Sequence, residues 1–373
     1  MQIAPFGVEL WLNEFEDSAR LNLAETSISA LSLREFFELC GLGDSALDEL
    51  LDARLSYGAI PGSERIRTAI SGLYENVTPD LVTLAHGTIG ANHLAHLVLT
   101  DAGDHVISFS PSYDQHAAIA ESIGAEVTVL PLLPENGYLP NLQELREAVR
   151  PSTKLICLTN PNNPTGTLMD AAMMAEVVGI ARSVDAYILC DEVYRGVEAP
   201  GVEPVPSVAD LYEKGIATSG LSKAFSLPGL RVGWAVIPEN LKARFADQRD
   251  YSIISVGVLD DLLGALAIEH HEVLLERSRS ILNRNRTVVE QWLENEPRAS
   301  WVKPDAGSAA LLKIEAPVDD RTFAIGLLEQ TGVLLTPGSA FGVPEHYRLG
   351  YTCSEETLRE GLAEISGYLD QLG

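Results

Sequence analysis

The sequence predicts an α/β fold in which a mostly parallel sheet of the seven-stranded type, with helices on both faces, precedes a smaller α+β domain. Between residues 81 and 237, short apolar runs alternate with helical patterns. Continuous apolar strands separated by helices are typical of a parallel sheet that is buried on both faces. Beyond residue 240 the pattern changes: two long helices are expected at 257–295, then short strands, then an amphipathic helix at 355–372.

The expected strands of the sheet are the runs LVTLAH, HVISFS, EVTVL, LICLTN, YILCDE, IATSG and VGWAVI. Helices are expected between several of them, for example at 141–149 and 171–183, and short strands follow around WVKP, AALLKI and GVLLTP. The first thirty residues show no sheet pattern and are expected to cover the site or to join the C-terminal domain. We therefore expect an N-terminal segment (1–30), a large domain (31–255), and an interdomain helix with a small domain (256–373).

Composition excludes several classes of protein. The chain has 26 basic and 53 acidic residues, a net charge of -27, which repels nucleic acid and anionic membranes. Its four cysteines form no CxxC pair, so neither a zinc site nor a disulfide framework is expected. His93 and His96 are three residues apart, but they have no HExxH context and are interpreted as ordinary helix residues, so no metal is expected. Without a signal peptide or a long uncharged apolar run, a cytoplasmic protein is expected.

Polar residues follow five of the predicted strands. In an open α/β sheet, ligands bind beyond the carboxyl ends of the strands, so these residues are expected to converge. They are His86 to Thr88, Ser110 to Tyr113, Asn160 to Gly166, Asp191 to Arg195, and Ser219 to Lys223.

Three of these strand ends, and Lys223 at a fourth, have side chains that indicate a ligand. Gly87 and Thr88 begin a helix, where free N–H groups favour an anion or where Thr88 simply caps the helix. The NPNNPTG turn presents asparagine side chains that can donate to a ligand oxygen. Asp191 ends an apolar strand and needs a cationic partner, either a ligand or a core arginine.

Lys223 is one of only six lysines and lies among small and apolar residues in SGLSKAFSLPGLRVGW. Desolvation would lower its pKa, and a neutral amine can form a Schiff base with a carbonyl group. Arg231, eight residues later, suits a phosphate. One ligand has a partner for each of these groups: an aldehyde for the amine, a pyridinium nitrogen for the carboxylate, a phenolic oxygen for asparagine and tyrosine, and a phosphate for the anion site. That ligand is pyridoxal 5'-phosphate (PLP), whose ring acts as an electron sink.

Seven motifs in order carry a resemblance to a known family: YGAIPGSERIRTAI, HGT, PSYDQH, NPNNPTG, DEVYR, SKAFSLPGLRVGW and HYRLGYT. The chain resembles the class I/II aminotransferases, the aspartate-aminotransferase family of fold type I PLP enzymes. The resemblance implies that Lys223 forms the aldimine and moves the Cα proton by way of a quinonoid. It also implies a homodimer with shared sites, in which Tyr57 reaches the neighbouring subunit's phosphate.

The remaining roles are implied residue by residue. Asp191 pairs with the pyridine nitrogen, Tyr194 and Asn163 hold the phenolic oxygen, and Tyr113 stacks on the ring. The resemblance also assigns the phosphate to Gly87, Thr88 and Arg231, and the substrate α-carboxylate to Arg348. One departure is Gly220, where many relatives have a phosphate-binding serine; Ser219 and Ser222 are the neighbouring candidates, and Ser222 is preferred.

The reaction favoured by the resemblance is transfer of an α-amino group to a 2-oxo acid. LPENGYLPNLQEL, QRDYSIIS and RLGYTC also resemble capreomycidine-synthase-type enzymes and PLP-dependent arginine oxidases, which would make the substrate arginine or a modified arginine. A cationic side chain needs a carboxylate partner when it is desolvated. Among Glu9, Glu14, Glu16 and Glu25, Glu25 is the expected substrate contact.

Other functional classes lack their context. GLGDSA (41–46) fits a loose dinucleotide fingerprint, but it follows an expected helix and not a strand. There is no Gly-Lys pair for a phosphate-binding loop of the nucleotide-hydrolase type. A PLP-fold regulator would have a basic DNA-binding extension, which this sequence does not contain.

Overall fold

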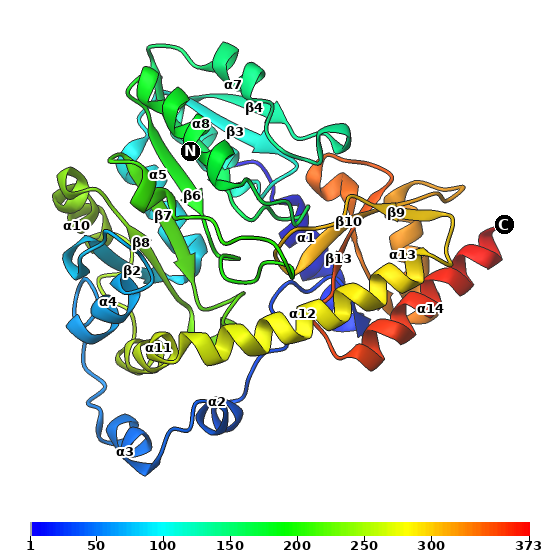
Figure 1. Ribbon diagram of the computed structural model, residues 1–373, viewed down its shortest axis with the longest axis horizontal. Coiled ribbons are helices and arrows are strands. Elements are labelled where there is room, and N and C mark those ends of the chain that lie inside the picture. The colour runs from blue at the N-terminus through cyan, green and yellow to red at the C-terminus, as the bar shows by residue number, and fades with distance from the viewer. Residues whose placement is uncertain (1) are drawn as a thin grey trace.

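The structure, a computed structural model, describes residues 2–373, and its largest element is a seven-stranded mixed sheet (Figure 1). β8 runs antiparallel to both of its neighbours, and all other neighbouring strands are parallel. Each of the seven predicted apolar runs forms one strand, which confirms the expected α/β architecture. The strand order is β2 (Val82–His86), β8 (Val232–Val236), β7 (Gly215–Gly220), β6 (Tyr187–Asp191), β5 (Thr153–Thr159), β3 (His105–Ser110) and β4 (Glu126–Pro131).

The strands are apolar throughout because each of their faces packs into its own core. Along β5, Leu155 and Cys157 belong to one core, whereas Ile156 and Leu158 belong to the other. Side chains alternate between the two faces of a strand. A strand that is buried on both faces therefore needs an unbroken apolar run, the pattern from which these strands were predicted.

Helices cover both faces of the sheet, as expected. On one face lie α5 (Gly87–Leu99), α6 (Gln115–Ile123) and α10 (Lys242–Asp250). On the other lie α4 (Glu64–Ser71), α7 (Leu142–Ala148), α8 (Ala171–Ser183), α9 (Val208–Leu211) and α11 (Val258–Glu269). α8 has the predicted bounds because Asp170 caps its first turn, its Oδ1 accepting from Met173 N at 2.8 Å.

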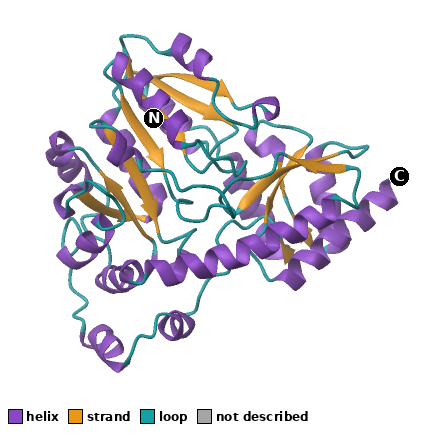
Figure 2. Ribbon diagram, in the orientation of Figure 1, coloured by secondary structure: helices purple, strands orange, loops and turns teal. Residues whose placement is uncertain are grey.

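The C-terminal part forms a smaller unit around a four-stranded antiparallel sheet (Figure 2). The sheet has the order β12 (Thr336–Pro337), β13 (His346–Gly350), β10 (Ala309–Ile314) and β9 (Ala299–Trp301). Its helices are the long α12 (His271–Leu293), which extends from α11 toward this unit in Figure 1, together with α13 (Asp320–Thr331) and α14 (Glu355–Leu372). The expected GVLLTP strand is divided between two sheets: β11 (Val333–Leu334) pairs with the N-terminal segment, and only β12 pairs with β13.

The N-terminal segment is fastened to this smaller unit. β1 (Leu21–Asn22) pairs in parallel with β11, and α1 (Gly7–Phe15) contacts β12. Trp11 is buried, and its Nε1 donates to the carbonyl of Leu335 at 2.9 Å. The segment also lines the main pocket, as described below, so both expectations for its position describe part of what it does.

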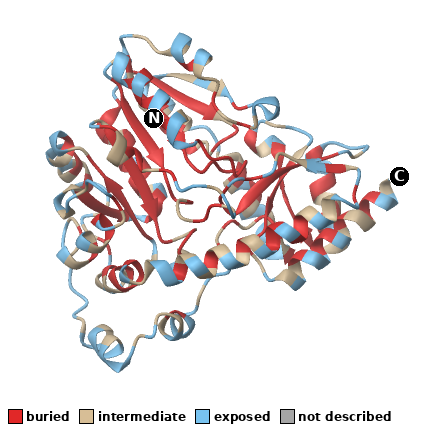
Figure 3. Cartoon of the chain, in the orientation of Figure 1, coloured by how far each residue is buried: buried red, intermediate tan, exposed pale blue. Residues whose placement is uncertain are grey.

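Two short helices, α2 (Leu33–Leu39) and α3 (Asp44–Asp52), form an arm that extends from the body of the molecule (Figure 1). Figure 3 shows that much of this arm is exposed. α3 begins directly after the GLGDSA glycines, which follow α2 and not a strand. No helix among residues 2–373 combines the length and the apolar character needed to cross a bilayer.

Candidate active site

The polar strand ends meet at a pocket of about 450 Å³ between the large sheet, the N-terminal segment and the smaller unit. Each of the five strand ends contributes to its lining: Thr88, Tyr113, Asn163, Asp191 with Tyr194, and Ser222 with Lys223. Arg348 of β13, Arg231 and Glu25 line it as well. A pocket of this size, with convergent polar groups at the carboxyl ends of parallel strands, is the expected position for a ligand site.

Lys223 lies in polar surroundings that its sequence neighbours do not indicate. Its Nζ donates to Thr26 Oγ1 at 2.8 Å and to Ser27 Oγ at 3.1 Å, and it is 3.7 Å from a carboxylate oxygen of Glu25. The side chain is 25% exposed. The apolar pocket expected from the sequence is therefore closed on one side by three polar residues of the N-terminal segment.

Glu25 is held in place beside the lysine. Its Oε1 accepts from the backbone N–H groups of Thr26, at 2.7 Å, and of Ser27. Burial raises the pKa of the Glu25 carboxyl, but the Lys223 ammonium and these N–H groups outweigh it, so the pKa is lowered overall. Glu25 is therefore an anion that pairs with Lys223 in this structure.

Asp191, at the end of β6, is buried and has no cation against its carboxylate oxygens. Oδ2 accepts from Asn92 Nδ2 at 2.7 Å, and Oδ1 accepts from the Val193 N–H at 3.0 Å. Burial raises the pKa of Asp191 to about 6, against the opposing effects of Asn92, Val193 and Lys223. No arginine among residues 2–373 pairs with Asp191, so a cationic ligand atom is the partner that the site lacks.

The opposite end of the pocket is suited to an anion. Thr88 lies in the first turn of α5, and its buried hydroxyl has no hydrogen-bond partner. The Arg231 guanidinium donates only to uncharged groups, to Ser222 Oγ at 3.5 Å and to the carbonyl of Pro228 at 2.9 Å. Gly87 has φ +70°, and a Cβ there would lie 2.8 Å from Arg231 Nη2, so only glycine allows this approach.

A side chain at position 220 would collide with Thr88, as one at position 87 would collide with Arg231. A Cβ at position 220 would lie 2.5 Å from Thr88 Oγ1 and 3.0 Å from the carbonyl of Val232. The Thr88 hydroxyl thus occupies the space into which a serine at 220 would project. Of the two neighbouring candidates, Ser222 lines the pocket, whereas Ser219 donates to the carbonyl of Glu192 at 3.4 Å.

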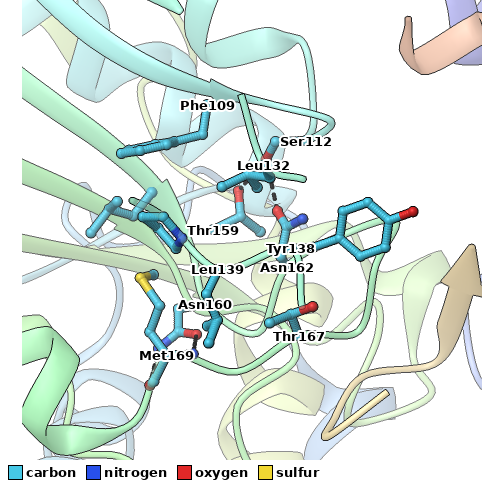
Figure 4. Close-up of a pocket in the computed structure, with 12 residues that line it drawn as sticks. Phe109, Ser112, Leu132, Tyr138, Leu139, Thr159, Asn160, Asn162, Thr167 and Met169 are labelled. Atoms are coloured by element: carbon cyan, nitrogen blue, oxygen red, sulfur yellow. Dashed lines mark hydrogen bonds between the residues drawn. The ribbon is translucent and has the colours of Figure 1, made fainter. Parts of the chain in front are cut away.

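The three asparagines of the NPNNPTG loop have different roles. Asn160 bonds both to the N–H and to the carbonyl of Met169, and Asn162 donates to the carbonyl of Pro111 and to Thr165 Oγ1. Figure 4 shows the small cavity behind the loop, about 20 Å³, where Ser112 donates to Asn162. These two asparagines hold the loop, which leaves Asn163 to line the larger pocket.

Arg348 is 3% exposed and carries unused donor capacity. It donates to the carbonyl of Ala24 at 3.0 Å and to Asn163 Oδ1 at 3.4 Å, and its Nε has no partner among residues 2–373. Burial lowers the pKa of its guanidinium, although arginine stays charged in proteins. A buried cation bonded only to neutral oxygens is suited to a carboxylate ligand.

The sequence named Glu9 and Glu16 as candidates but favoured Glu25, and it did not predict the contact of α1 with Tyr113. Glu9 accepts from Tyr113 Oη at 3.0 Å, and Glu9, Asn13 and Glu16 all line the pocket. Burial, together with the Glu9 carboxylate, raises the pKa of Tyr113. Since the contact spans 104 positions of the chain, no local signal could have located it.

Two other predicted features lie outside the pocket. Tyr57 is 82% exposed in the loop after α3. His96 is buried and bonds through its ring to His116 at 3.3 Å, near Cys157, in the core beneath α5. Burial lowers the pKa of both imidazoles, that of His116 to about 4, so both rings are neutral at pH 7.

Comparison with known proteins adds independent information. The family model for aminotransferase class I and II matches residues 45–365. Capreomycidine synthase of Streptomyces vinaceus is 30% identical over 96% of this chain and 92% of its own length, and arginine–pyruvate transaminase AruH of Pseudomonas aeruginosa is 27% identical over 98% and 95%. The crystal structure of a PLP-dependent aminotransferase from Streptococcus suis superposes with a TM-score of 0.97, with 42% identity, over 100% of this chain and 99% of that one.

The pocket residues fit PLP. An orphaned hydroxyl, the start of α5 and an arginine that lacks an anion are suited to its phosphate. A buried carboxylate without a cation is suited to its pyridinium nitrogen, and the Lys223 amine lies in the same pocket. Each of these groups lacks the partner that one cofactor would supply.

Proposed function

Since the chain belongs to the aminotransferase class I and II family and is a PLP-dependent enzyme, we propose that it transfers the α-amino group of an amino acid to a 2-oxo acid. The observation that carries this proposal is that Lys223, Asp191 and Arg348 line one pocket. Bound PLP would supply an aldehyde and an electron-withdrawing ring. The protein would supply an amine, a carboxylate for the ring nitrogen and a guanidinium for the substrate.

The proposed roles of the individual residues are those that the resemblance to the family implies. Thr88, Gly87, Ser222 and Arg231 bind the phosphate, and Tyr113 packs on the ring. Asn163 and Tyr194 bind the phenolic oxygen, and Arg348 binds the substrate α-carboxylate. Once its amine is free of the cofactor, Lys223 would remove the proton from the substrate Cα. It would then deliver a proton to the carbon that receives the amino group.

The lining of the pocket supports a cationic amino acid as the donor. Glu9, Glu16 and Glu25 bring three carboxylates to the side formed by the N-terminal segment. Glu25 pairs with Lys223 only while the lysine amine is free, so Glu25 as well as Glu9 and Glu16 can receive a substrate cation when Lys223 holds the cofactor. One relative is named as an arginine–pyruvate transaminase, which agrees with this choice.

A second candidate function is cyclisation or oxygen-dependent oxidation of arginine or a modified arginine. The observation that favours it is the 30% identity with capreomycidine synthase over 96% of this chain. The same residues would bind the cofactor and the α-carboxylate in either reaction. The two candidates differ in what happens to the substrate after the Cα proton is lost.

A donor screen decides between these functions. The holoenzyme would be incubated with arginine, lysine, aspartate and leucine, each with and without pyruvate and each with and without oxygen. Transamination predicts alanine formation from arginine that requires pyruvate and not oxygen. Consumption of arginine without pyruvate would instead establish the second candidate, and a preference for aspartate would contradict the cationic donor.

We also place the protein in a homodimer with shared sites. Tyr57, Leu51 and Leu55 expose large apolar surfaces on and after α3. Apolar patches of this kind mark protein interfaces. Tyr57 would thereby reach the phosphate of the neighbouring subunit.

A further inference from the structure

Asn92 lies beside Asp191 among the residues that line the pocket, on α5 and one turn after Thr88. It is 1% exposed, and its Nδ2 donates to Asp191 Oδ2 at 2.7 Å. The same Nδ2 donates to Gln115 Oε1 at 3.3 Å, and its Oδ1 accepts from Thr218 Oγ1 at 2.5 Å. Every polar atom of this side chain is therefore bonded inside the core.

These partners fix the direction in which the amide faces. Gln115 Nε2 donates to the carbonyl of Ile89 at 2.7 Å, which turns the Gln115 oxygen toward Asn92. The Thr218 hydroxyl approaches from the other side. A reversed Asn92 amide would set its oxygen against the oxygens of both Asp191 and Gln115, so the network selects the orientation in which Asn92 donates to Asp191.

A donor that cannot reverse favours the ionised form of its partner. Asp191 is buried at the end of β6, where burial alone favours the neutral acid. The other groups that face it are the Val193 N–H, which donates to Oδ1 at 3.0 Å, the Lys223 ammonium and the phenol of Tyr113. The carboxylate thus depends on a small number of donors, of which Asn92 is the closest.

We propose that Asn92 is a positioning residue, held by Thr218 and Gln115, which keeps Asp191 ionised and aimed at the ring nitrogen of PLP. The inference rests on the proposed role of Asp191 in binding that nitrogen. Asn92 touches neither cofactor nor substrate in this account and acts only through the carboxylate. Weaker PLP binding and a shifted titration of the bound cofactor are its expected signatures.

The test measures PLP affinity by equilibrium dialysis in Asn92→Leu, Thr218→Val and Thr218→Ser. Asn92→Leu is expected to raise the PLP dissociation constant by roughly ten- to a hundredfold, the effect of losing a hydrogen bond to a charged group. Thr218→Val should cause a smaller loss in the same direction, because the buried Asn92 oxygen then loses its donor and the amide is held less firmly against Asp191. Thr218→Ser keeps the hydroxyl and should bind PLP like the wild type. The pH at which the visible absorbance of the bound cofactor changes should shift in Asn92→Leu and Thr218→Val and not in Thr218→Ser.

Asp191→Asn and the double variant Asp191→Asn, Asn92→Leu separate this inference from the function on which it rests. If Asn92 acts through Asp191, its substitution should have little further effect on PLP affinity once Asp191 is changed. Loss of affinity in Asp191→Asn with wild-type affinity and absorbance in Asn92→Leu would overturn the inference alone. Unchanged affinity in Asp191→Asn would overturn the role of Asp191 itself. Should Asn92→Leu fail to fold, the contrast between Thr218→Val and Thr218→Ser decides, and equal affinities there would overturn the inference.

Discussion

At the scale of single residues, the site is built from groups whose partners are missing. The Thr88 hydroxyl, the Nε of Arg348 and the carboxylate of Asp191 are buried, and each lacks a group that would satisfy it fully. Buried polar groups are normally hydrogen-bonded. Several such groups around one pocket therefore indicate a ligand, and their chemistry matches PLP and an amino acid carboxylate.

Gly220 gives a prediction at this scale. A serine there would clash with the Thr88 hydroxyl, so Gly220→Ser is expected to weaken PLP binding about tenfold or more, as overpacking at a well-packed site costs roughly 1–3 kcal/mol. In a Thr88→Ala background the closest contact is gone, so Gly220→Ser should then weaken PLP binding less, relative to Thr88→Ala alone, than it does in the wild type. Gly229→Ser is the control, because a Cβ at 229 meets nothing within 4 Å. Equal PLP affinities for Gly220→Ser and wild type would show that Thr88 does not fill this space.

At the scale of elements, the sequence predicted what depends on local pattern. The seven strands of the large sheet and the bounds of α8 and α14 followed from apolar runs, helical periodicity and caps. The antiparallel direction of β8 could not be predicted, because a strand has the same apolar content whichever way it runs. The division of GVLLTP between two sheets could not be predicted either; Leu335 lies between the two short strands.

The same distinction applies to the site. The strand-end residues could be named because the topology of an α/β sheet places them together. The contacts of Thr26 and Ser27 with Lys223, and of Glu9 with Tyr113, could not be predicted, since each spans more than a hundred positions of the chain. Asn92 left one weak signal, a single amide on a helix whose neighbouring buried positions are mostly apolar.

The helix α1 carries a prediction about specificity. Glu9→Gln keeps an oxygen for Tyr113 but removes the charge, so the KM for arginine should rise roughly tenfold or more while the KM for leucine stays the same. Glu14→Gln is the matched control, because Glu14 lies on the same helix but pairs with Arg321 outside the pocket. Steady-state kinetics of the two variants with both donors measure the difference. An equal rise in both KM values for Glu9→Gln would contradict a charge-selective contact.

At the scale of the whole molecule, the pocket is closed by parts that come from opposite ends of the chain. The N-terminal segment lies over Lys223 and is fastened to the C-terminal unit through β1, β11 and Trp11. The arm formed by α2 and α3 extends away from this body and exposes Tyr57 (Figure 1). The proposed dimer assigns this exposed Tyr57 to the site of a neighbouring subunit.

Mixed dimers test this sharing of sites. Tyr57→Phe should lower PLP affinity, and Lys223→Ala should bind no PLP covalently. When the two variants are mixed and allowed to exchange subunits, one site per mixed dimer regains both Tyr57 and Lys223. Covalent labelling at limiting PLP should then exceed the average of the two parents. Labelling equal to that average, or full activity in a monomer by sedimentation, would contradict the shared site.

The central claim is that Lys223 holds PLP in this pocket, and reduction with borohydride tests it most directly. The holoenzyme should lose its visible absorbance, and peptide mass mapping should find one pyridoxyl phosphate group on Lys223. Because the chain has only six lysines, the assignment can be made against Lys154, Lys214, Lys242, Lys303 and Lys313. Lys223→Ala should carry no label. A label on any other lysine, or one that persists in Lys223→Ala, would contradict the account.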